Sequence, residues 1–565
     1  MIQRTLAANA FLAISLLAGC GGGGGSPTPP VVTPPLAEFA IVSSRPADVA
    51  GEAPRSGGFV ATFSAAPDPA SINATSLQLL GPQGNAIPGV VTVKGKDVSF
   101  LPDVPALPGG TKYTANFLPS IKDVGARSLN APYSRSFTTA PQAWGAVSRQ
   151  VAEMPYLTSG VTPVVAIDKS GNATAVWRHQ VSGIATAFAS RMDHGTGNWS
   201  VPVVIHAATG IFGDIGGFSI SADGNGNAYV VWTEYDNGKQ SILMARYVSA
   251  KSAWNQPIAI NGLPTGLVPS DAVIAIDGNG VLTVVMRSNF MDGVYGTRFD
   301  PAADTWSIPV EIEKPAVDNY IFNLQLVADS AGNATLGWVQ RGTVNNGFNV
   351  ARYSAANGNW SAPHTLDVNV TSGPFALAAD VAGGATVAWT HGNQVMDTPS
   401  IVASRFDVGA ITWSKPARLS GDGDAFGASA PAVAVDAAGI ATVVWAQSRG
   451  IVEARSGRST ATWSTARRIG TAAPDLGQFA VTTDLAGNVL LLYVADGTTM
   501  AMHYSATSAL WMAPAAIGTP DGGQNVFANS PVSVIDVAGN VTAVWLAQIS
   551  VAGTPRYVVA ANRFH

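Results

Sequence analysis

Eight Asp-x-x-Gly motifs recur at a nearly constant interval in the chain after residue 140, and this repetition restricts the fold more than any other feature. The intervals between successive aspartates are 55, 54, 52, 51, 56, 48 and 52 residues. Such a period indicates one supersecondary unit copied along the chain and stacked on its neighbours. Asp at the first and Gly at the fourth position of a four-residue turn is typical of a type I turn. We therefore assign a structural role to the aspartates of the eight turns: Asp168, Asp223, Asp277, Asp329, Asp380, Asp436, Asp484 and Asp536.

Each repeat contains four segments that we predict to be β-strands. A short apolar run leads into the Asp turn, and a second run ends on a large apolar residue nine positions after the aspartate, as at Trp177. A third run ends in an arginine that an aromatic residue usually follows, as at Arg246 and Tyr247. The fourth begins at a Trp-Ser-x-Pro sequence, as at Trp306. Four antiparallel strands repeated eight times are typical of β-propeller blades, so we predict an eight-bladed β-propeller for residues 141–565.

The order of these segments predicts how the ring closes. The eighth repeat runs through Asp536, Trp545 and Arg563, and no Trp-Ser strand follows them. Residues 142–147, around Trp144, resemble a degenerate fourth strand placed ahead of the first repeat. An N-terminal strand that completes the last blade would remove two free sheet edges. We therefore expect a closed ring, and the alternative is an open stack of the same repeats.

Residues 37–140 have a different pattern, with short strand-like segments between Gly, Pro and Asp turns. This rhythm is typical of a β-sandwich. We predict strands at 58–63, 77–80, 90–93, 98–101, 113–117 and 135–138. The sequences Ala61–Ser64, Leu107–Thr114 and Ser136–Thr139 make this region resemble the SbsA-type bacterial Ig-like domain. That resemblance implies a structural domain without catalytic residues, which we interpret as a spacer.

The first 36 residues predict export and lipid anchoring. Arg4 precedes an apolar segment, which ends in Leu-Ala-Gly at Cys20. This segment resembles the lipobox of bacterial lipoproteins, which implies cleavage of the signal peptide, residues 1–19, and lipidation of Cys20. Residues 20–36 are rich in glycine and then in proline, so we expect an extended tether. Gly21 after the cysteine implies the outer membrane, and we expect a cell-envelope protein that faces the periplasm or the cell surface.

Composition and charge exclude several other classes. The formal net charge is −5 and the isoelectric point is about 5.8, and no dense run of Lys and Arg occurs, which argues against a nucleic-acid partner. Only 12% of the residues are charged, and 60 Gly and 36 Pro favour β-structure over helical bundles. Cys20 is the one cysteine, so lipidation leaves no thiol for disulfides or metal sites. We predict no cofactor and no metal, and we expect a monomer.

Two repeated side chains are interpreted as packing groups. All fourteen tryptophans fall at two positions of the repeat: eight open strand four and six end strand two. Because ligand platforms use non-repeated aromatics, we assign these tryptophans to packing between blades. His503 replaces the strand-three arginine in one repeat. We predict that some of these arginines bond turn carbonyls or Asp carboxylates within a blade. The arginines are Arg191, Arg246, Arg298, Arg352, Arg405, Arg455 and Arg563.

Loop lengths distinguish the two faces of the predicted propeller. The loops between strands one and two, and between strands three and four, are uniformly short and share one face, here called the Asp-turn face. The other loops vary in length and carry irregular polar residues on the opposite face, here called the variable face. Functional residues concentrate on variable loops held by a rigid scaffold, so we expect a ligand there. The candidate ligand-binding residues are Arg178, His179, Glu234, Tyr235, Asp236, Arg287, Asn289, Arg341, His391, Asn393, Gln447, Arg449 and Asp496.

No catalytic constellation stands out in the propeller sequence. The repeat resembles, loosely, the PQQ-type repeat of eight-bladed propellers and the Asp-box of sialidases, but its Asp-to-Trp spacing differs from the first and its motif order from the second. Asp223 to Asn227 with Glu234 imitates a calcium loop, yet strand two would carry Glu234 too far away. We therefore expect a non-catalytic binding or scaffold module for a protein or polysaccharide ligand. The alternative is a carbohydrate-active hydrolase or lyase, which would bring carboxylates, or a carboxylate and a histidine, together in one funnel.

Overall fold

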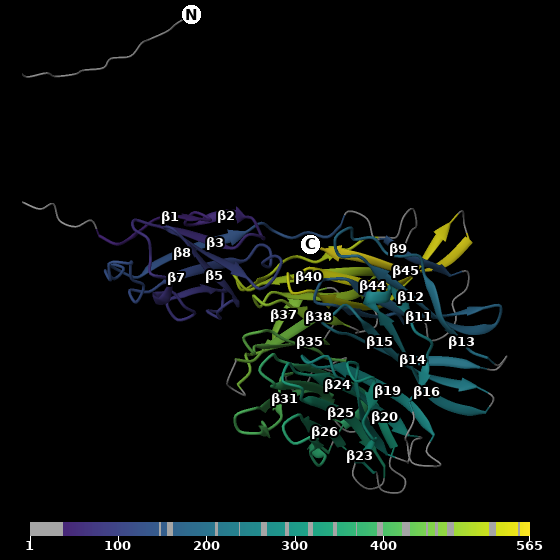
Figure 1. Cartoon of the computed structure of the whole chain (residues 1–565). Coiled ribbons are helices and arrows are strands. Elements are labelled where there is room, and N and C mark those ends of the chain that lie inside the picture. Colours follow the sequence, from purple (N-terminus) through teal and green to yellow (C-terminus); the bar gives the residue numbers. More distant parts are fainter. Residues whose placement is uncertain are drawn as a thin grey trace, which may run out of the picture. The chain divides into compact units, whose positions relative to one another are not determined.

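The structure of this all-β chain is a computed structural model. It describes residues 38–565 except for 146–148, 155–161, 210–212, 237, 261–267, 289–292, 315–319, 343–346, 369, 393–398, 421–429, 448–449, 458–461, 472–478, 519–526 and 552–553. Phe39–His565 form one compact unit, many of whose strands are labelled in Figure 1. The predicted signal peptide, Cys20 and the tether lie outside the described residues. Within the described part, no helix has the length and apolar character needed to cross a membrane.

The first part of this unit is a sandwich of two four-stranded sheets, with strand orders β1-β3-β6-β5 and β2-β8-β7-β4. Alternate residues face inward, and Phe59 lies with its ring centroid 5.8 Å from that of Phe117 and 6.3 Å from that of Phe137. All six predicted strands are present to within two residues, whereas β1 and β2 were missed. The strands are β1 (Ile41–Arg45), β2 (Ala50–Ala53), β3 (Phe59–Phe63), β4 (Leu77–Leu80), β5 (Gly89–Lys94), β6 (Asp97–Pro102), β7 (Lys112–Phe117) and β8 (Tyr133–Thr139), with a 3-10 turn η1 (Pro69–Ser71).

Eight further sheets follow, and they are the blades of a propeller. In seven of them the strands are hydrogen-bonded in sequence order, whereas the eighth takes its outer strand, β9 (Arg149–Met154), from ahead of the first blade. In five of them the outer strand is split into two short pieces that both pair with strand three. The split falls at the proline of the Trp-x-x-Pro sequence, which has no N–H to donate to the ladder. The strands of blades 1 to 4 are β10 (Val164–Ile167), β11 (Ala173–Val181), β12 (Ile184–Met192), β13 (Val203–Ala207); β14 (Asp214–Ala222), β15 (Ala228–Asp236), β16 (Lys239–Val248), β17 (Ala253–Trp254), β18 (Ile258–Ala259), with a 3-10 turn η2 (Ser249–Lys251); β19 (Pro269–Ile276), β20 (Leu282–Ser288), β21 (Val294–Asp300), β22 (Thr305–Trp306), β23 (Val310–Glu313); and β24 (Tyr320–Ala328), β25 (Ala334–Arg341), β26 (Gly347–Ser354), β27 (Asn359–Trp360), β28 (His364–Asp367).

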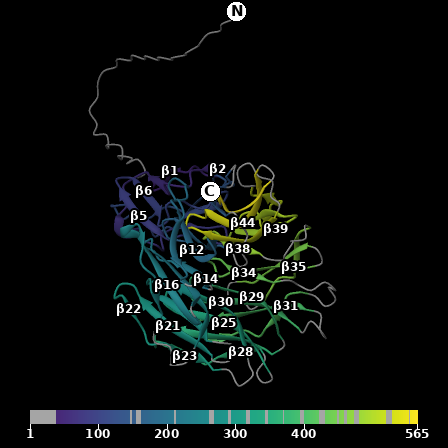
Figure 2. The same cartoon turned by 90° about the vertical axis from the view of Figure 1, so that its right-hand side faces the viewer.

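The ring is closed, as the sequence predicts. The first strand of each blade lies beside the first strand of the next, and the series ends with β43 beside β10. Figure 2 labels β14, β29, β34 and β38 among these first strands. The strands of blades 5 to 8 are β29 (Val370–Ala379), β30 (Ala385–His391), β31 (Ser400–Asp407), β32 (Thr412–Trp413), β33 (Ala417–Arg418); β34 (Ala432–Val435), β35 (Ala441–Gln447), β36 (Gly450–Arg455), β37 (Arg467–Gly470); β38 (Ala480–Thr483), β39 (Val489–Ala495), β40 (Thr498–Ser505), β41 (Leu510–Trp511), β42 (Ala515–Ala516); and β43 (Phe527–Ile535), β44 (Val541–Val551), β45 (Thr554–Phe564), β9 (Arg149–Met154).

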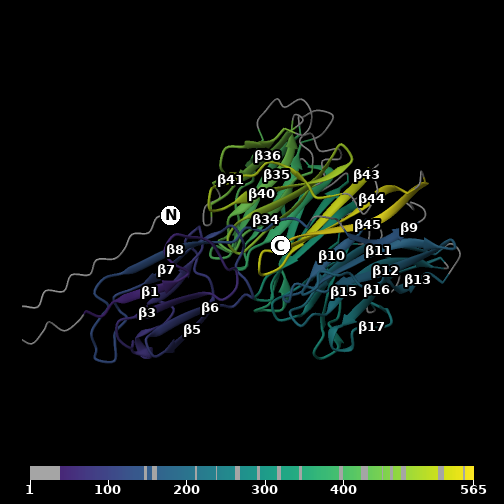
Figure 3. The same ribbon diagram turned by 90° about the horizontal axis from the view of Figure 1, so that it is seen from above.

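The N-terminal segment supplies the fourth strand of blade 8. Trp144 forms an antiparallel bridge with Phe564, and β9 pairs with β45 farther along the same strand (Figure 3). The sequence placed this strand at residues 142–147, whereas its main hydrogen-bonded part is β9 at Arg149–Met154. The reason is that this outer strand, like those of five other blades, has a short piece at the tryptophan and a second piece after it. The open-stack alternative is wrong for this chain.

The repeated tryptophans pack between blades, as predicted. Those that end strand two are at most 2% exposed. Trp177 of blade 1 belongs to one apolar cluster with Leu546 of blade 8, and Trp232 of blade 2 clusters with Ala187 of blade 1. Such burial of large aromatic rings is a major favourable term in the free energy of folding. The junctions between blades therefore hold much of the apolar core of the ring.

Candidate functional site

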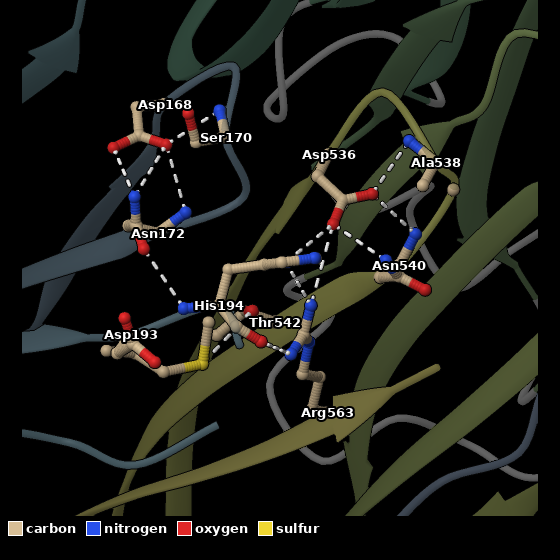
Figure 4. A network of polar contacts seen from close by, with 12 residues as sticks. Asp168, Ser170, Asn172, Asp193, His194, Asp536, Ala538, Asn540, Thr542 and Arg563 are labelled. Atoms are coloured by element: carbon tan, nitrogen blue, oxygen red, sulfur yellow. Dashed lines mark hydrogen bonds and ion pairs between the residues drawn. The ribbon is translucent and has the colours of Figure 1, made fainter. Parts of the chain in front are cut away.

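The Asp turns on the Asp-turn face are built alike. In blade 1, Oδ1 of Asp168 accepts hydrogen bonds from the backbone N–H of Ser170 at 2.9 Å and of Asn172 at 3.0 Å (Figure 4). The Nδ2 group of Asn172 donates to Oδ2 of the same carboxylate at 3.0 Å. A carboxylate that accepts several N–H bonds holds its turn in one conformation. Seven of the repeat aspartates are buried, and Asp380 is half-buried.

The strand-three arginines link neighbouring blades. Arg298 lies 2.6 Å from the Asp277 carboxylate of its own blade and donates to the carbonyl of Gly332 in the next blade at 3.2 Å. Arg352 and Arg405 make the same type of bond to next-blade carbonyls, at 3.0 and 2.7 Å. The predicted bonds to carboxylates within a blade are therefore present. The carbonyl acceptors belong to the next blade, which corrects the prediction for that part.

Most of these guanidinium groups also stack on an aromatic ring. Arg298 lies 4.4 Å from the ring centre of Tyr353 in the next blade, and Arg455 lies 4.0 Å from that of Tyr504. A guanidinium over an aromatic face is attracted by the negative potential of the ring. In blade 2 the arrangement differs, because Arg246 stacks on Tyr229 of its own blade. The charged side chains of the Asp-turn face thus largely contact other residues of the propeller.

At the junction of blades 8 and 1, a histidine replaces the aromatic partner. Arg563 donates to the backbone carbonyl of His194 at 2.8 Å and to its Nδ1 atom at 2.6 Å (Figure 4). The same guanidinium lies 3.6 Å from the carboxylate of Asp536 in its own blade. Since arginine can only donate, Nδ1 of His194 acts as the acceptor. The ring closure therefore carries a polar contact as well as the strand pairing.

On the variable face, two predicted arginines reach across blade junctions. Arg178 of β11 forms an ion pair with Asp214 at the start of β14, at 2.5 Å. Arg287 of β20 donates to the carbonyl of Ile321 in β24 at 2.6 Å. Burial raises the pKa of Asp271, and the nearby positive charge of Arg287 opposes that shift. Both arginines therefore contribute to the contacts between blades.

Two histidine–carboxylate pairs occupy equivalent positions at different junctions. His206 of blade 1 lies 2.6 Å from Glu234 of blade 2. Asp367 of blade 4 lies 2.7 Å from His391 of blade 5. His206 and Asp367 face equivalent residues of strand three, and Glu234 and His391 each follow the strand-two tryptophan by two positions. The acid and the histidine have thus exchanged places between the two junctions.

The other candidates fall into four groups. Tyr235 is 48% exposed, and Arg341 and Asp496 are also exposed. Asp236 accepts from the Thr209 hydroxyl, and Gln447 accepts from the indole N–H of Trp445 at 2.6 Å. His179 is buried against Phe188, and that burial lowers the pKa of the imidazole. Asn289, Asn393 and Arg449 lie outside the described residues.

Sequence reasoning missed Asp214, His206, Asp271 and Asp367. A signal for two of them exists: His206 and Asp367 each follow the tryptophan of strand four by seven residues. Comparing that position with the residue two places after the next strand-two tryptophan would have shown the complementary pairs. Asp271 carries no such repeated signal.

The calcium-like sequence around Asp223 is an ordinary Asp turn. Its carboxylate accepts from the backbone N–H groups of Asn225 and Asn227, both at 2.9 Å, while Glu234 bonds to His206 in another blade junction. Among the residues that the structure describes, no group of three or more His, Cys, Asp or Glu side chains could hold a metal ion. Glu234 is thus paired at the contact between blades 1 and 2 and not at the Asp223 turn.

The fold and the two faces define an all-β protein that joins an Ig-like sandwich to an eight-bladed propeller. Residues 36–139 match the family model of the bacterial Ig-like domain. A search of curated proteins found no match to the chain.

Solved structures that are similar to this chain include the following three. A structure of the Dos1 propeller has 11% identity and a TM-score of 0.42, covering 73% of this chain and 95% of that one. The polysaccharide lyase Uly1 has 9% identity and a TM-score of 0.41, covering 73% and 89%. A mutant NanB sialidase from Streptococcus pneumoniae has 10% identity and a TM-score of 0.31, covering 94% and 93%. At these values the similarities carry no statement about function.

Proposed function

We propose that the chain is a non-catalytic lipoprotein of the cell envelope that binds a protein or glycan through the variable face of its propeller. The observation that carries this proposal is the contrast between the two faces. On the Asp-turn face, the repeated aspartates are bonded within their own turns, and several of the repeated arginines are bonded to the next blade. The variable face instead presents side chains that differ from blade to blade, among them the exposed Tyr235, Arg341 and Asp496.

Contacts between blades at the variable face support a binding role. The ion pair of Arg178 with Asp214 and the pair of His206 with Glu234 join successive blades at this face. Side chains fixed in this way lose little conformational entropy when a ligand binds. Exposed residues between them then supply the contacts specific to the ligand. Such an arrangement suits recognition of an extended surface or chain.

The lipid anchor is part of the same proposal and rests on the sequence around Cys20. Cleavage before Cys20 and acylation of its thiol would place the molecule in the envelope, with the outer membrane as the destination implied by Gly21. Metabolic labelling with an alkyne fatty acid tests this step. We expect label and membrane association for the natural chain and neither for Cys20→Ser.

The binding role is tested with the full chain on a glycan array and in pull-downs from envelope extracts. A ligand of the variable face should lose about tenfold in affinity when Tyr235 and Arg341 are both changed to alanine, since central aromatic and arginine contacts carry much of the binding energy. The control is Lys169→Ala, an exposed residue of the Asp-turn face. Equal losses in the two proteins would contradict the proposal.

A carbohydrate-active hydrolase or lyase is the second candidate, because His206 and Glu234 form a histidine–carboxylate pair within hydrogen-bond distance. The equivalent pair of Asp367 with His391 favours a structural use, since the same position is reused at another junction. Release of reducing ends or unsaturated products from polysaccharides measures such an activity. Activity that disappears in Glu234→Gln but persists in Asp367→Asn would favour the enzyme.

A further inference from the structure

The third residue of the Asp turn is exposed in some blades and buried in others. It is buried in blades 6, 7 and 8, where it is Ala438, Ala486 and Ala538. Ala486 belongs to the apolar core of the Ig-like domain, together with Leu107 and Phe137. A side chain that enters the core of another domain marks a packed contact between the two. The exposed residues at this position in blades 1 to 5 are Ser170, Asn225, Asn279, Ala331 and Ala382.

The Ig-like domain bonds to the turns of the same three blades. In blade 6, the side-chain N–H of Gln83 donates to the carboxylate of Asp436 at 3.1 Å. In blade 7, Asn85 donates to the carbonyl of Leu485 at 3.3 Å. In blade 8, Arg55 donates to the carbonyl of Ala538 at 2.6 Å. The domain therefore contacts the Asp-turn face of three successive blades.

Blade 7 lacks the cation that links other blades. His503 stands where the strand-three arginine would lie, and its burial lowers the pKa of the imidazole to about 4, so that the ring is neutral. In blades 3, 4 and 5 the arginine donates to the turn glycine carbonyl of the next blade. The corresponding carbonyl, that of Gly539 in blade 8, instead accepts from Gln142 at 3.0 Å. Arg55 bonds the adjacent carbonyl of Ala538.

Among the described residues of blade 8, a second internal donor is missing. In blades 1, 2, 4 and 7, the amide oxygen of the asparagine after the Asp turn accepts from a backbone N–H between strands three and four of its own blade. The equivalent residue of blade 8 is Asn540, whose fourth strand comes from the N-terminal segment. Its amide oxygen accepts from Arg55 at 3.0 Å and from Gln142 at 3.1 Å.

We infer that the Ig-like domain, with the linker residue Gln142, completes the propeller at blades 7 and 8 by replacing the contacts that these blades cannot make themselves. Buried carbonyl and amide oxygens without donors would destabilise the closure of the ring. Arg55 and Gln142 supply those donors, and Ala486 adds an apolar contact with the core of the Ig-like domain. The domain thereby acts as an integral support of the ring, in contrast to the spacer expected from its family.

A cavity lies next to His503, whose side chain is shorter than that of the arginine found at this position in other blades. It has a volume of about 220 Å³ and lies among Gly110, Gln142, Trp144, Ala501 and Phe564. A longer side chain at position 503 would have room to extend toward blade 8. An arginine at position 503 could therefore take over the donor role of Arg55 and Gln142.

The test uses the full chain with Arg55→Ala and Gln142→Ala combined. Hydrogen exchange should speed up by about tenfold or more at the turns 484–488 and 536–540, because the closure of blades 7 and 8 would open more often. Adding His503→Arg should restore much of the lost protection. The matched control is Arg45→Ala, since Arg45 is an exposed arginine of the same domain. Unchanged exchange in the double variant, or an equal loss in the control, would overturn the inference.

A thiol pair covers the case in which the double variant does not fold. The backbone N–H of Lys112 donates to the hydroxyl of Thr507 in blade 7 at 2.9 Å, so Lys112→Cys and Thr507→Cys, with Cys20→Ala, place two thiols at the contact. Oxidation should recover the folded ring of the double variant, and reduction should remove it again. A double variant that neither the disulfide nor His503→Arg recovers would speak against the inference.

Discussion

Blades 3 and 7 use the same turn in different ways. In blade 3, Arg298 of the blade itself neutralises Asp277, whose side chain is 1% exposed, and bonds the next blade. In blade 7, Asp484 is buried with an uncharged histidine at the arginine position, and the Ig-like domain covers the turn. The comparison teaches that a repeat can lose a linking residue where another domain supplies the missing donors. Blade 3 depends on its own side chains, and blade 7 depends on its neighbour.

The largest expected effect is in blade 3. Arg298→Ala removes the partner of the buried Asp277 carboxylate and the stacking contact with Tyr353. We expect the free energy of unfolding to fall by about 3 kcal/mol, because an unpaired buried charge is costly. Denaturant unfolding measures it, with the exposed Lys251→Ala as the control. A change no larger than that of the control would mean that blade 3 does not rely on its arginine.

The second prediction compares one turn position in two blades. Ala486→Asn places a polar side chain in the core of the Ig-like domain, so we expect a loss of about 2 kcal/mol from overpacking and desolvation. Ala331→Asn, at the exposed equivalent in blade 4, should change the free energy by less than about 0.5 kcal/mol. Thermal unfolding of the two proteins decides the matter. Similar losses would show that the turn of blade 7 is no more covered than that of blade 4.

The third prediction concerns the charge of Asp484. Burial raises its pKa to about 6, against hydrogen bonds from Asn488 and the turn backbone that lower it. Because the folded pKa lies above the unfolded value of 3.8, folding favours the protonated acid, and stability is lost as pH rises toward and through about 6. The free energy of unfolding of Asp484→Asn, relative to that of the natural chain, should therefore rise by about 2 kcal/mol between pH 4 and pH 7.

Two comparisons make that result specific. Burial lowers the pKa of His503 in the folded chain to about 4. The folded chain therefore becomes less stable as the pH falls below the ordinary pKa of histidine, 6.5, which opposes the effect of Asp484. The measurement is therefore the difference in free energy of unfolding between the variant and the natural chain at each pH, because the contribution of His503 cancels in this difference. Asp277→Asn, in blade 3, should be destabilising at pH 7, because it leaves Arg298 without its carboxylate. The same sign for both substitutions would remove the distinction between the two blades.

The repeat itself was predictable because its signals are local. Asp and Gly four positions apart set the turn, and the tryptophan nine residues after Asp marks the end of strand two. Ring closure was also predictable, because the eighth repeat lacks a Trp-Ser strand and Trp144 precedes the first. The position of β9 was missed, since its sequence has no tryptophan or turn signal of its own.

The contact between the Ig-like domain and the propeller could not be predicted in the same way. Arg55 and Ala538 are far apart in the sequence, and neither is unusual within its own domain. Two weak signals exist in the propeller: alanine at the third turn position of blades 6 to 8, and His503 in place of arginine. Neither signal alone indicates a contact with another domain, since alanine also occupies the third turn position in blades 4 and 5, where it is exposed. Only the folded arrangement connects them.

The bridge between Trp144 and Phe564 affects the order in which the propeller can fold. These partners are separated by 420 residues, so the first cannot pair until nearly all of the propeller has been synthesised and, if exported, delivered. Until then, blade 8 has a free outer edge, and blade 1 lacks the packing contact with a complete blade 8. A chaperone that delays assembly would be most useful in this interval, and truncation anywhere in residues 554–564 would leave a product that stays in the incomplete form.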